Sequence, residues 1–243
     1  MIDWTLDDRI AMLTLANSAA RNAIPLAAWR RLAAVIDDVA RSDAHVLIVR
    51  SGVTGIFSAG ADISEFARFA EDADAAATFR TTMRSGIEAL AALPIPTIIA
   101  FDGGCYGAAV ALALAANIRI AGREAHFAVT PAKLGIGYPA EDVSRLIAQI
   151  GRGQASRLLF SAQAIDAAEA ARIGLVECVV DDAAGEAAAL AATIATHPFE
   201  AIAQLKATIA DPSRASHVTA FDAAFAGAAF ARALAAFQSR KKS

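Results

Sequence analysis

Two glycine-bearing turns each lie between a predicted buried strand and a predicted helix. They are residues 57–62 (FSAGAD) and residues 103–109 (GGCYGAA). A helix N-terminus carries unpaired backbone N–H groups and a partial positive charge, and small residues let an oxygen atom approach them. If the two turns face each other, two N–H groups could point at one oxygen and stabilise an oxyanion or an enolate. Each could also be an ordinary tight turn.

A third segment, residues 135–142 (GIGYPAED), carries the side chains best suited to acid–base chemistry. Glu141 and Asp142 fall in the first turn of a predicted helix that runs to Ile150, where a negative charge meets the helix dipole favourably. If either carboxylate points inward instead, it becomes a candidate general acid or base, because desolvation raises its pKa. Asp62 is expected to cap the helix that follows it.

The histidines and cysteines give no metal-binding pattern. Cys105 and Cys178 lie far apart in apolar segments and are expected to be buried, reduced thiols. His126 is interpreted as a core histidine on a strand. The sequence therefore predicts neither a metal site nor a separate cofactor.

We expect these segments to be positioned by a fold in which strands alternate with helices. We expect strands at 10–15, 46–49, 97–100, 118–120 and 126–129, and helices at 25–40, 62–70, 74–93 and 107–116. Residues 51–60 are expected to form a loop and residues 103–104 a turn. After Pro139 the pattern becomes helical, with one short strand at 176–180 and a final helix over 216–238. The prediction is an α/β core over residues 1–190 and a helical C-terminal region over 191–243.

Composition limits the function classes. The chain has 243 residues, of which 56% are hydrophobic and 19% charged, enough to bury one large core. Its longest charge-free stretches, 89–101 and 103–118, contain prolines or glycines and are shorter than the ~20 residues that a spanning helix needs. A net charge of −3 gives no general attraction to nucleic acid or anionic membranes. The N-terminal residues lack a signal-peptide pattern. We therefore expect a soluble, cytoplasmic protein that binds neither nucleic acid nor membrane.

Several short blocks, in order along the chain, resemble the crotonase family, also called the enoyl-CoA hydratase/isomerase superfamily. They are residues 21–23 (RNA), 57–62 (FSAGAD), 96–103 (PTIIAFDG), 116–121 (ANIRIA), 133–135 (KLG), 167–170 (AAEA), 173–176 (IGLV) and 236–241 (AFQSRK). The resemblance implies a crotonase-like spiral of ββα repeats with a helical C-terminal trimerisation region. It also implies an acyl-CoA thioester as ligand, coenzyme A being part of the substrate, and assembly as a homotrimer or a dimer of trimers.

The same resemblance implies roles for individual residues. The oxyanion hole would use the backbone N–H groups of Ala61 and Ala108. The 3′-phosphate of coenzyme A would meet basic side chains, for which Arg21, Arg240 and Lys241 are available. The segments that hold substrate or coenzyme A would include Arg21, Ala23, Ala59, Gly60, Asp62, Ile63, Gly107, Pro131 and Lys241.

The chain departs from the family where hydratases carry two glutamates that activate water. Those positions are Ala111 and Pro131 here, and neither side chain can transfer a proton. Residues 130–138 (TPAKLGIGY) instead resemble the methylmalonyl-CoA decarboxylase branch, in which a tyrosine at the position of Tyr138 lies in the active site. We expect decarboxylation or a related lyase or isomerase step that uses Tyr138, and Glu141 or Asp142. Tyr138 would orient a substrate carboxylate or form a pocket wall. The alternative is a non-catalytic acyl-CoA-binding or scaffold protein.

Overall fold

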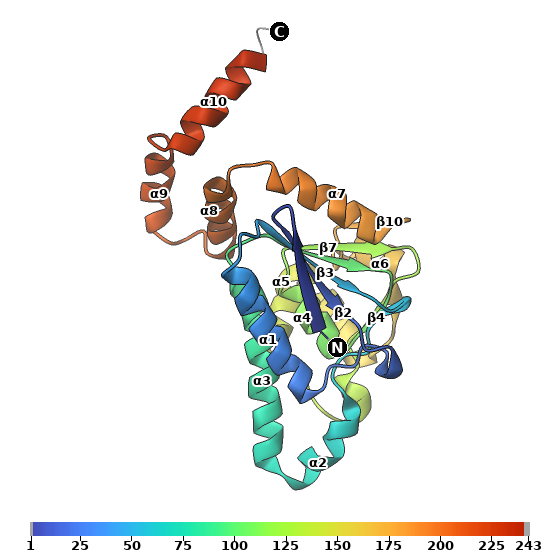
Figure 1. Cartoon of the computed structure of the whole chain (residues 1–243). Helices are drawn as coiled ribbons and strands as arrows, with labels where there is room; N and C mark the ends of the chain where they lie inside the picture. The colour runs from blue at the N-terminus through green and yellow to red at the C-terminus, as the bar shows by residue number, and fades with distance from the viewer. Residues whose placement is uncertain (1, 241–243) are drawn as a thin grey trace.

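The computed structural model describes residues 2–240, which form a two-sheet α/β core with helices around it (Figure 1). One sheet has six strands in the order β1-β2-β3-β5-β7-β10, and the other has four in the order β4-β6-β8-β9. The strands are β1 (Ile2–Asp7), β2 (Ile10–Leu15), β3 (Val46–Ser51), β4 (Gly55–Ser58), β5 (Thr97–Phe101), β6 (Gly103–Tyr106), β7 (Ile118–Gly122), β8 (His126–Ala128), β9 (Ile165–Asp166) and β10 (Cys178–Val180).

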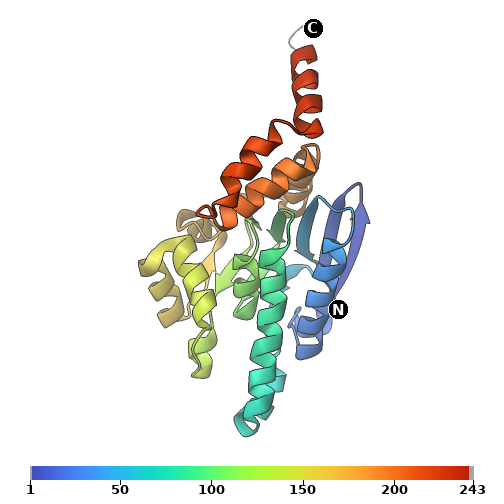
Figure 2. The same cartoon turned by 90° about the vertical axis from the view of Figure 1, so that its left-hand side faces the viewer.

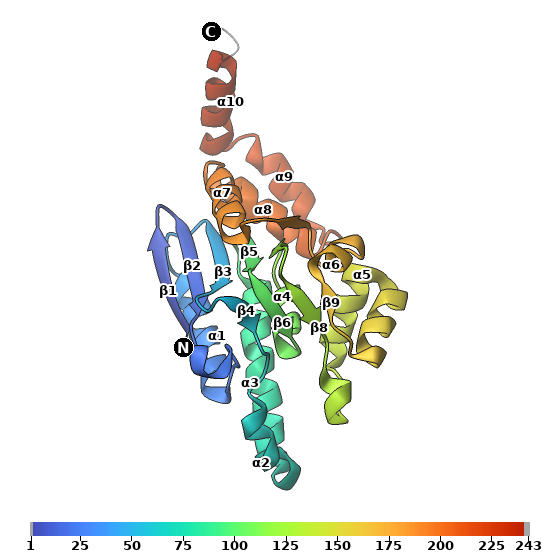
Figure 3. The same cartoon turned by 90° about the vertical axis from the view of Figure 1, so that its right-hand side faces the viewer.

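From β3 to β8, consecutive strands alternate between the two sheets, which makes this part of the chain a spiral. The pairs β3–β4, β5–β6 and β7–β8 each give their first strand to the six-stranded sheet and their second to the four-stranded one, and helices follow each pair. Figure 3 shows β4, β6, β8 and β9 side by side across the molecule. Pairing is parallel within each sheet except for β1 with β2 and β8 with β9. The predicted α/β spiral of ββα repeats is confirmed.

The central strands are apolar because helices cover both faces of the six-stranded sheet. Ile48, Ile98 and Ile118 stand in register across β3, β5 and β7. On one face, α7 (Ala183–Ala195) places buried alanines at a spacing of four residues against this sheet. Buried strands of parallel sheets have continuous hydrophobic sequences, and most residues of Val46–Ser51 and Thr97–Phe101 are hydrophobic.

The remaining helices surround this core. They are η1 (Ser18–Ala20), α1 (Leu26–Ala40), η2 (Ile63–Glu65), α2 (Phe66–Glu71), α3 (Ala73–Ala92), α4 (Ala108–Leu114), η3 (Pro131–Leu134), α5 (Ala140–Ser161), α6 (Ala167–Arg172), α8 (Phe199–Ala210), α9 (Ser216–Ala224) and α10 (Ala228–Arg240). Figure 2 shows α3 running lengthwise toward the end of the molecule opposite α10. α5 changes direction at Gly151, whose backbone is not helical.

Three predicted elements are wrong. The 51–60 loop contains strand β4, and the turn at 103–104 lies inside strand β6, because short strands rich in glycine lack the apolar alternation that signals a strand. The predicted helix over 216–238 is two helices, α9 and α10, separated at residues 225–227, where Gly227 disfavours helix continuation. The strand β9 was not predicted.

No single helix within residues 2–240 has the length and apolar character to cross a membrane. The bent pair of Ser216–Ala224 and Ala228–Gln238 passes that test only when its two helices are taken together.

Candidate active site

The first glycine turn is held against the segment that follows η1. The N–H of Ala59 donates to the carbonyl of Arg21 at 3.0 Å, and the N–H of Ile24 donates to the carbonyl of Gly60 at 2.8 Å. The N–H of Asp62 returns a bond to Ile24 at 3.2 Å. The two segments predicted to hold coenzyme A therefore lie side by side.

Side chains reinforce this junction. The hydroxyl of Ser58 donates to the carbonyl of Asn22 at 2.6 Å, and the Asn22 amide donates to the carbonyl of Phe57 at 3.0 Å and to the Ser51 hydroxyl at 2.8 Å. Asn22 and Ser58 are buried. Buried polar groups that are fully paired fix one geometry, so the turn is rigid.

The two glycine turns meet at Gly60. A Cβ at this position would lie 2.5 Å from the Tyr106 carbonyl oxygen and 3.1 Å from the Ala108 nitrogen, and Gly60 has φ +92°. Only glycine allows this approach. The two turns are therefore in direct contact at Gly60, which is the condition expected from the sequence for a shared site.

A cavity of about 200 Å³, here called the core cavity, opens where the turns meet. Ala61 and Ala108 both line it. Within residues 2–240 the backbone N–H groups of these two alanines have no hydrogen-bond acceptor, whereas those of Gly60, Asp62 and Gly107 are paired. Two unpaired donors beside one cavity are one of the features that an oxyanion hole requires. Predicted site residues Ala59, Ile63, Gly107, Pro131 and Tyr138 also line the core cavity.

Tyr138 supports the second turn. Its hydroxyl donates to the carbonyl oxygen of Gly107 at 3.0 Å, and the N–H of Gly107 donates to the Ala128 carbonyl at 2.9 Å. Gly107 has φ +52° and immediately precedes Ala108. Tyr138 thus helps to fix the peptide that carries the Ala108 N–H. Burial and the charge of Asp142 hold the pKa of Tyr138 well above its usual range, so the phenol stays protonated.

The structure does not bring Glu141 or Asp142 to the core cavity. Asp142 is buried and pairs with Arg84 at 2.9 Å and with Arg145 at 3.5 Å. Burial raises the pKa of this carboxyl and the arginines oppose that rise. Glu141 is exposed and lies 3.3 Å from Arg84. Both carboxylates join α5 to α3 through these ion pairs.

The hydratase glutamate positions hold no acid in this fold. Ala111 is fully buried in α4, and Pro131 lines the core cavity. No aspartate or glutamate lines this cavity within residues 2–240. The side chains around the core cavity therefore provide polar groups from Arg80, Thr130 and Tyr138 and are otherwise apolar.

The sequence reasoning missed the wall that comes from α2 and α3. This wall consists of Phe66, Phe79, Arg80 and Met83, and the η3 loop adds Leu134, Ile136, Gly137 and Pro139. A second cavity of about 680 Å³ shares Ile63, Phe66 and Phe79 with the core cavity, which extends the apolar surface. The i, i+4 spacing of Phe79 and Met83 on one helix face is the signal that could have indicated this wall.

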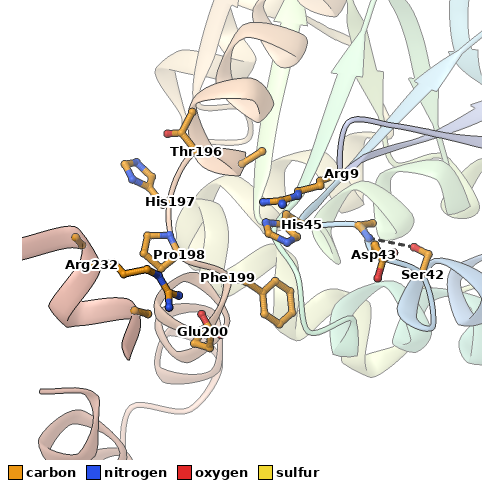
Figure 4. A pocket seen from close by; sticks show the side chains of 14 residues that line it. Arg9, Ser42, Asp43, His45, Thr196, His197, Pro198, Phe199, Glu200 and Arg232 are labelled. Atoms are coloured by element: carbon orange, nitrogen blue, oxygen red, sulfur yellow. Dashed lines mark hydrogen bonds between the residues drawn. The ribbon is translucent and has the colours of Figure 1, made fainter. Parts of the chain in front are cut away.

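A larger cavity of about 820 Å³, here called the C-terminal cavity, lies between the core and the C-terminal helices (Figure 4). Its charged lining includes Arg9, Asp43, Glu200 and Arg232, and the ring of His45 lies 5.0 Å from that of Phe199. None of its lining residues belongs to either glycine turn.

The other predicted residues have mixed outcomes. Asp62 caps η2 as predicted, accepting a bond from the N–H of Ser64 at 3.0 Å. Ala23 lines a separate hollow of about 300 Å³ rather than the core cavity. Lys241 and the side chain of Arg240 lie outside the described residues. His126 is exposed, not a core histidine, and its Nδ1 lies 2.8 Å from the Glu124 carbonyl. Both cysteines are free thiols, but only Cys105 is fully buried.

Comparisons with known proteins agree with this geometry. A family model described as enoyl-CoA hydratase/isomerase matches residues 5–235. The chain is 34% identical to "Probable enoyl-CoA hydratase EchA17" of Mycobacterium tuberculosis, over 86% of this chain and 80% of that protein. It is 36% identical to the mitochondrial methylglutaconyl-CoA hydratase of Mus musculus over 71% of this chain and 54% of the other. The solved structure of an enoyl-CoA hydratase/carnithine racemase from Magnetospirillum magneticum superposes with a TM-score of 0.93 at 30% identity, covering 98% of this chain and 92% of that one.

Proposed function

This chain belongs to the enoyl-CoA hydratase/isomerase family, and we propose that it binds an acyl-CoA thioester and stabilises the thioester enolate with two backbone N–H groups. The donors are those of Ala61 and Ala108. The observation that carries the proposal is that both are unpaired and line one cavity that holds no carboxylate side chain. Fixed donors in a largely apolar cavity stabilise developing negative charge more strongly than water does.

The proposed reaction is of the decarboxylase or lyase type, or an isomerisation, rather than water addition. Two-glutamate hydration needs carboxylates to position and activate water, and Ala111 and Pro131 occupy those positions. The names of the relatives refer to hydratases, and the proposal departs from those names because neither Ala111 nor Pro131 can move a proton.

Decarboxylation requires fewer catalytic side chains than two-glutamate hydration does. The electron pair of the broken bond between the α-carbon and the carboxylate moves into the enolate, carbon dioxide leaves, and the charge collects on the thioester oxygen between the two donors. A proton from water or a weak acid then returns to the α-carbon. Tyr138, held on Gly107, keeps one donor in position during this step.

A panel of thioesters tests the reaction class. Malonyl-, methylmalonyl- and crotonyl-CoA would be incubated with the protein and the products separated by chromatography and mass spectrometry. We expect loss of carbon dioxide from a malonyl-type thioester and no rapid hydration of crotonyl-CoA. Rapid hydration would show that the two-glutamate argument is wrong. Binding without turnover across the panel would favour the non-catalytic, acyl-CoA-binding alternative.

A proline substitution tests the oxyanion donor directly. Ala108 is the first residue of α4, a position where proline fits a helix while lacking an N–H. Ala108→Pro should lower turnover by about 10²–10³-fold, the usual cost of one oxyanion donor. Ala228→Pro, at the first residue of α10 and also after a glycine, is the matched control and should keep full activity. Unchanged turnover in Ala108→Pro would exclude this N–H from catalysis.

We also propose that the C-terminal helices form the contact between subunits of a trimer or a dimer of trimers. Val218, Phe221 and Phe225 are each more than half exposed on and after α9, a large apolar surface for an isolated chain. Figure 1 shows α9 and α10 projecting from the core. Analytical ultracentrifugation tests this, and a monomer at micromolar concentration would contradict it.

A further inference from the structure

The core cavity contains one side chain whose charge has no counterpart. Arg80, on α3, is the single ionised group among the residues that line the cavity within the described chain. Its neighbours on the same helix face, Phe79 and Met83, are apolar and nearly buried. Across residues 2–240, no hydrogen bond or ion pair is made by the Arg80 side chain, which is exposed.

Arg84, one helical turn further along α3, shows what a structural arginine looks like in this region. It contacts Glu88 at 3.1 Å, Glu141 at 3.3 Å and Asp142 at 2.9 Å, and its side chain is only 20% exposed. Arg145 adds ion pairs to Glu88 and Asp142. Glu88 and Asp142 thus each contact both arginines and Glu141 contacts Arg84, whereas Arg80 lines the cavity without an acidic partner.

We infer that Arg80 binds a free carboxylate on the acyl group, so that the substrate is an acyl-CoA derived from a dicarboxylic acid. This inference rests on the proposed function, because it assigns the acyl group of the thioester in the same cavity. A guanidinium donates two parallel hydrogen bonds to one carboxylate, a geometry that favours a carboxylated acyl group over an uncharged one. An uncharged acyl chain would leave this cation unpaired.

The carboxylate can be the group that leaves or one further along the chain, and the two cases behave differently. A carboxylate that departs as carbon dioxide loses its charge, so pairing with Arg80 strengthens binding but opposes the bond-breaking step. A more distant carboxylate keeps its charge throughout and gains binding alone. Ligands of two lengths separate these cases.

Binding measurements with pairs of thioesters that are similar in size but differ in one carboxylate test the inference. Isothermal titration calorimetry would compare malonyl-CoA with isovaleryl-CoA, in which an isopropyl group replaces the carboxylate, and glutaryl-CoA with hexanoyl-CoA. Arg80→Gln should weaken binding of at least one carboxylated thioester by ~5–10-fold, the range for a partly exposed charge-assisted pair, and leave the uncharged partner unchanged. The difference should shrink at high salt, since Arg80 is exposed at the cavity edge.

Two further variants control for fold and charge. Arg68→Gln removes an exposed arginine from α2 that does not line the cavity and should change neither ligand class. Arg80→Lys keeps the charge and should recover part of the lost affinity. Equal weakening of charged and uncharged thioesters in Arg80→Gln, or no weakening of either, would overturn the inference. If the unaltered protein binds no acyl-CoA at all, the proposed function fails instead.

Discussion

The core cavity and the C-terminal cavity differ both in volume and in the residues that line them. The C-terminal cavity is about four times larger, 820 Å³ against 200 Å³, and carries both arginines and acids. The core cavity is small and mostly apolar, no carboxylate lines it within the described residues, and the unpaired backbone donors of Ala61 and Ala108 lie beside it. Fixed dipoles in a water-poor space are worth more to a developing anion than mobile charged side chains in an open one. The candidate active site is therefore identified by the backbone donors and side chains that line the core cavity, and not by the volume of that cavity.

The two cavities also differ in how their walls are held. Backbone hydrogen bonds among the segments around Ile24, Gly60 and Gly107 fix the core cavity. The C-terminal cavity is closed on one side by residues of α10, which projects from the core in Figures 1 and 3. We therefore expect substitutions in the first cavity to affect turnover, and those in the attachment of the C-terminal helices to affect stability.

The largest effect should come from Gly60→Ala. The added Cβ would lie 2.5 Å from the Tyr106 carbonyl oxygen, which is backbone and cannot move without displacing the neighbouring Ala108 N–H. A displacement of about 1 Å in a catalytic group costs at least ~10²-fold. Steady-state turnover of the best thioester in the panel measures this loss.

Gly151→Ala separates the clash from backbone strain. Gly151 also has a positive φ, +76°, but no atom lies within 4 Å of its added Cβ. Because φ 76° with ψ 158° is a combination that only glycine adopts readily, this variant should lose ~1–3 kcal/mol of stability and keep its turnover. If Gly60→Ala behaves the same way, the contact between the turns does not control catalysis, and the contrast between the two cavities fails.

The second-largest expected effect is on stability, and it concerns α8, which begins beside the C-terminal cavity. Lys206 on α8 is buried, its Nζ donates to the Ile95 carbonyl at 2.5 Å, and burial lowers its pKa to about 8. The unfolded chain, with a lysine pKa near 10.5, binds more protons than the folded chain between these two values. Stability should therefore rise with pH from about 8 to 10.5, by up to ~3 kcal/mol from this residue.

Urea unfolding across this pH range measures the Lys206 contribution as the difference between the unaltered protein and Lys206→Met. The rise should be smaller in Lys206→Met and unchanged in Lys133→Met, which removes an exposed lysine. Turnover near neutral pH should not depend on Lys206. Identical pH dependence in all three proteins would show that Lys206 titrates normally in the fold. A large loss of turnover in Lys206→Met would show that the two regions are coupled.

Much of the fold and of the backbone site could be predicted from the sequence. Parallel strands such as Thr97–Phe101 are continuous apolar runs, and the pattern also located the two glycine-bearing turns before helices. The family resemblance then indicated Ala61 and Ala108 as the donors within these turns. The absence of acids at Ala111 and Pro131 needed only the sequence.

The rest depends on contacts between distant segments. Asp142 was a candidate acid or base because its sequence position lies near Tyr138, but Arg84, 58 residues earlier, holds it in an ion pair. Arg80 carried no sequence signal, because a lone arginine on a helix is ordinarily a solvated charge. The role of Tyr138 likewise depends on its reach to Gly107, 31 residues away.

The smallest effect, and the finest test of the core cavity, is expected from Tyr138→Phe. The change deletes one hydrogen bond to the Gly107 carbonyl, which keeps a second bond from the Val110 N–H at 3.0 Å. Loss of about 1 kcal/mol should lower kcat roughly fivefold with little change in KM. Because the pKa of Tyr138 is raised well above its usual value of 10, the phenol stays neutral, and the pH profiles of both proteins should have the same shape up to about pH 10.

The two tyrosines of the chain provide the matched comparison for this last test. Tyr106→Phe alters a side chain that does not line the core cavity and should leave kcat unchanged. If Tyr138 donated to a substrate carboxylate, its hydroxyl would have to leave Gly107, and Tyr138→Phe would raise KM for carboxylated thioesters only. If Tyr138 transferred a proton, one limb of the pH profile would disappear in the variant. If Tyr138 only positions the Ala108 donor, kcat should fall by the same factor for every thioester that is turned over, because every enolate uses that donor. This result would distinguish the positioning role from carboxylate binding and from proton transfer.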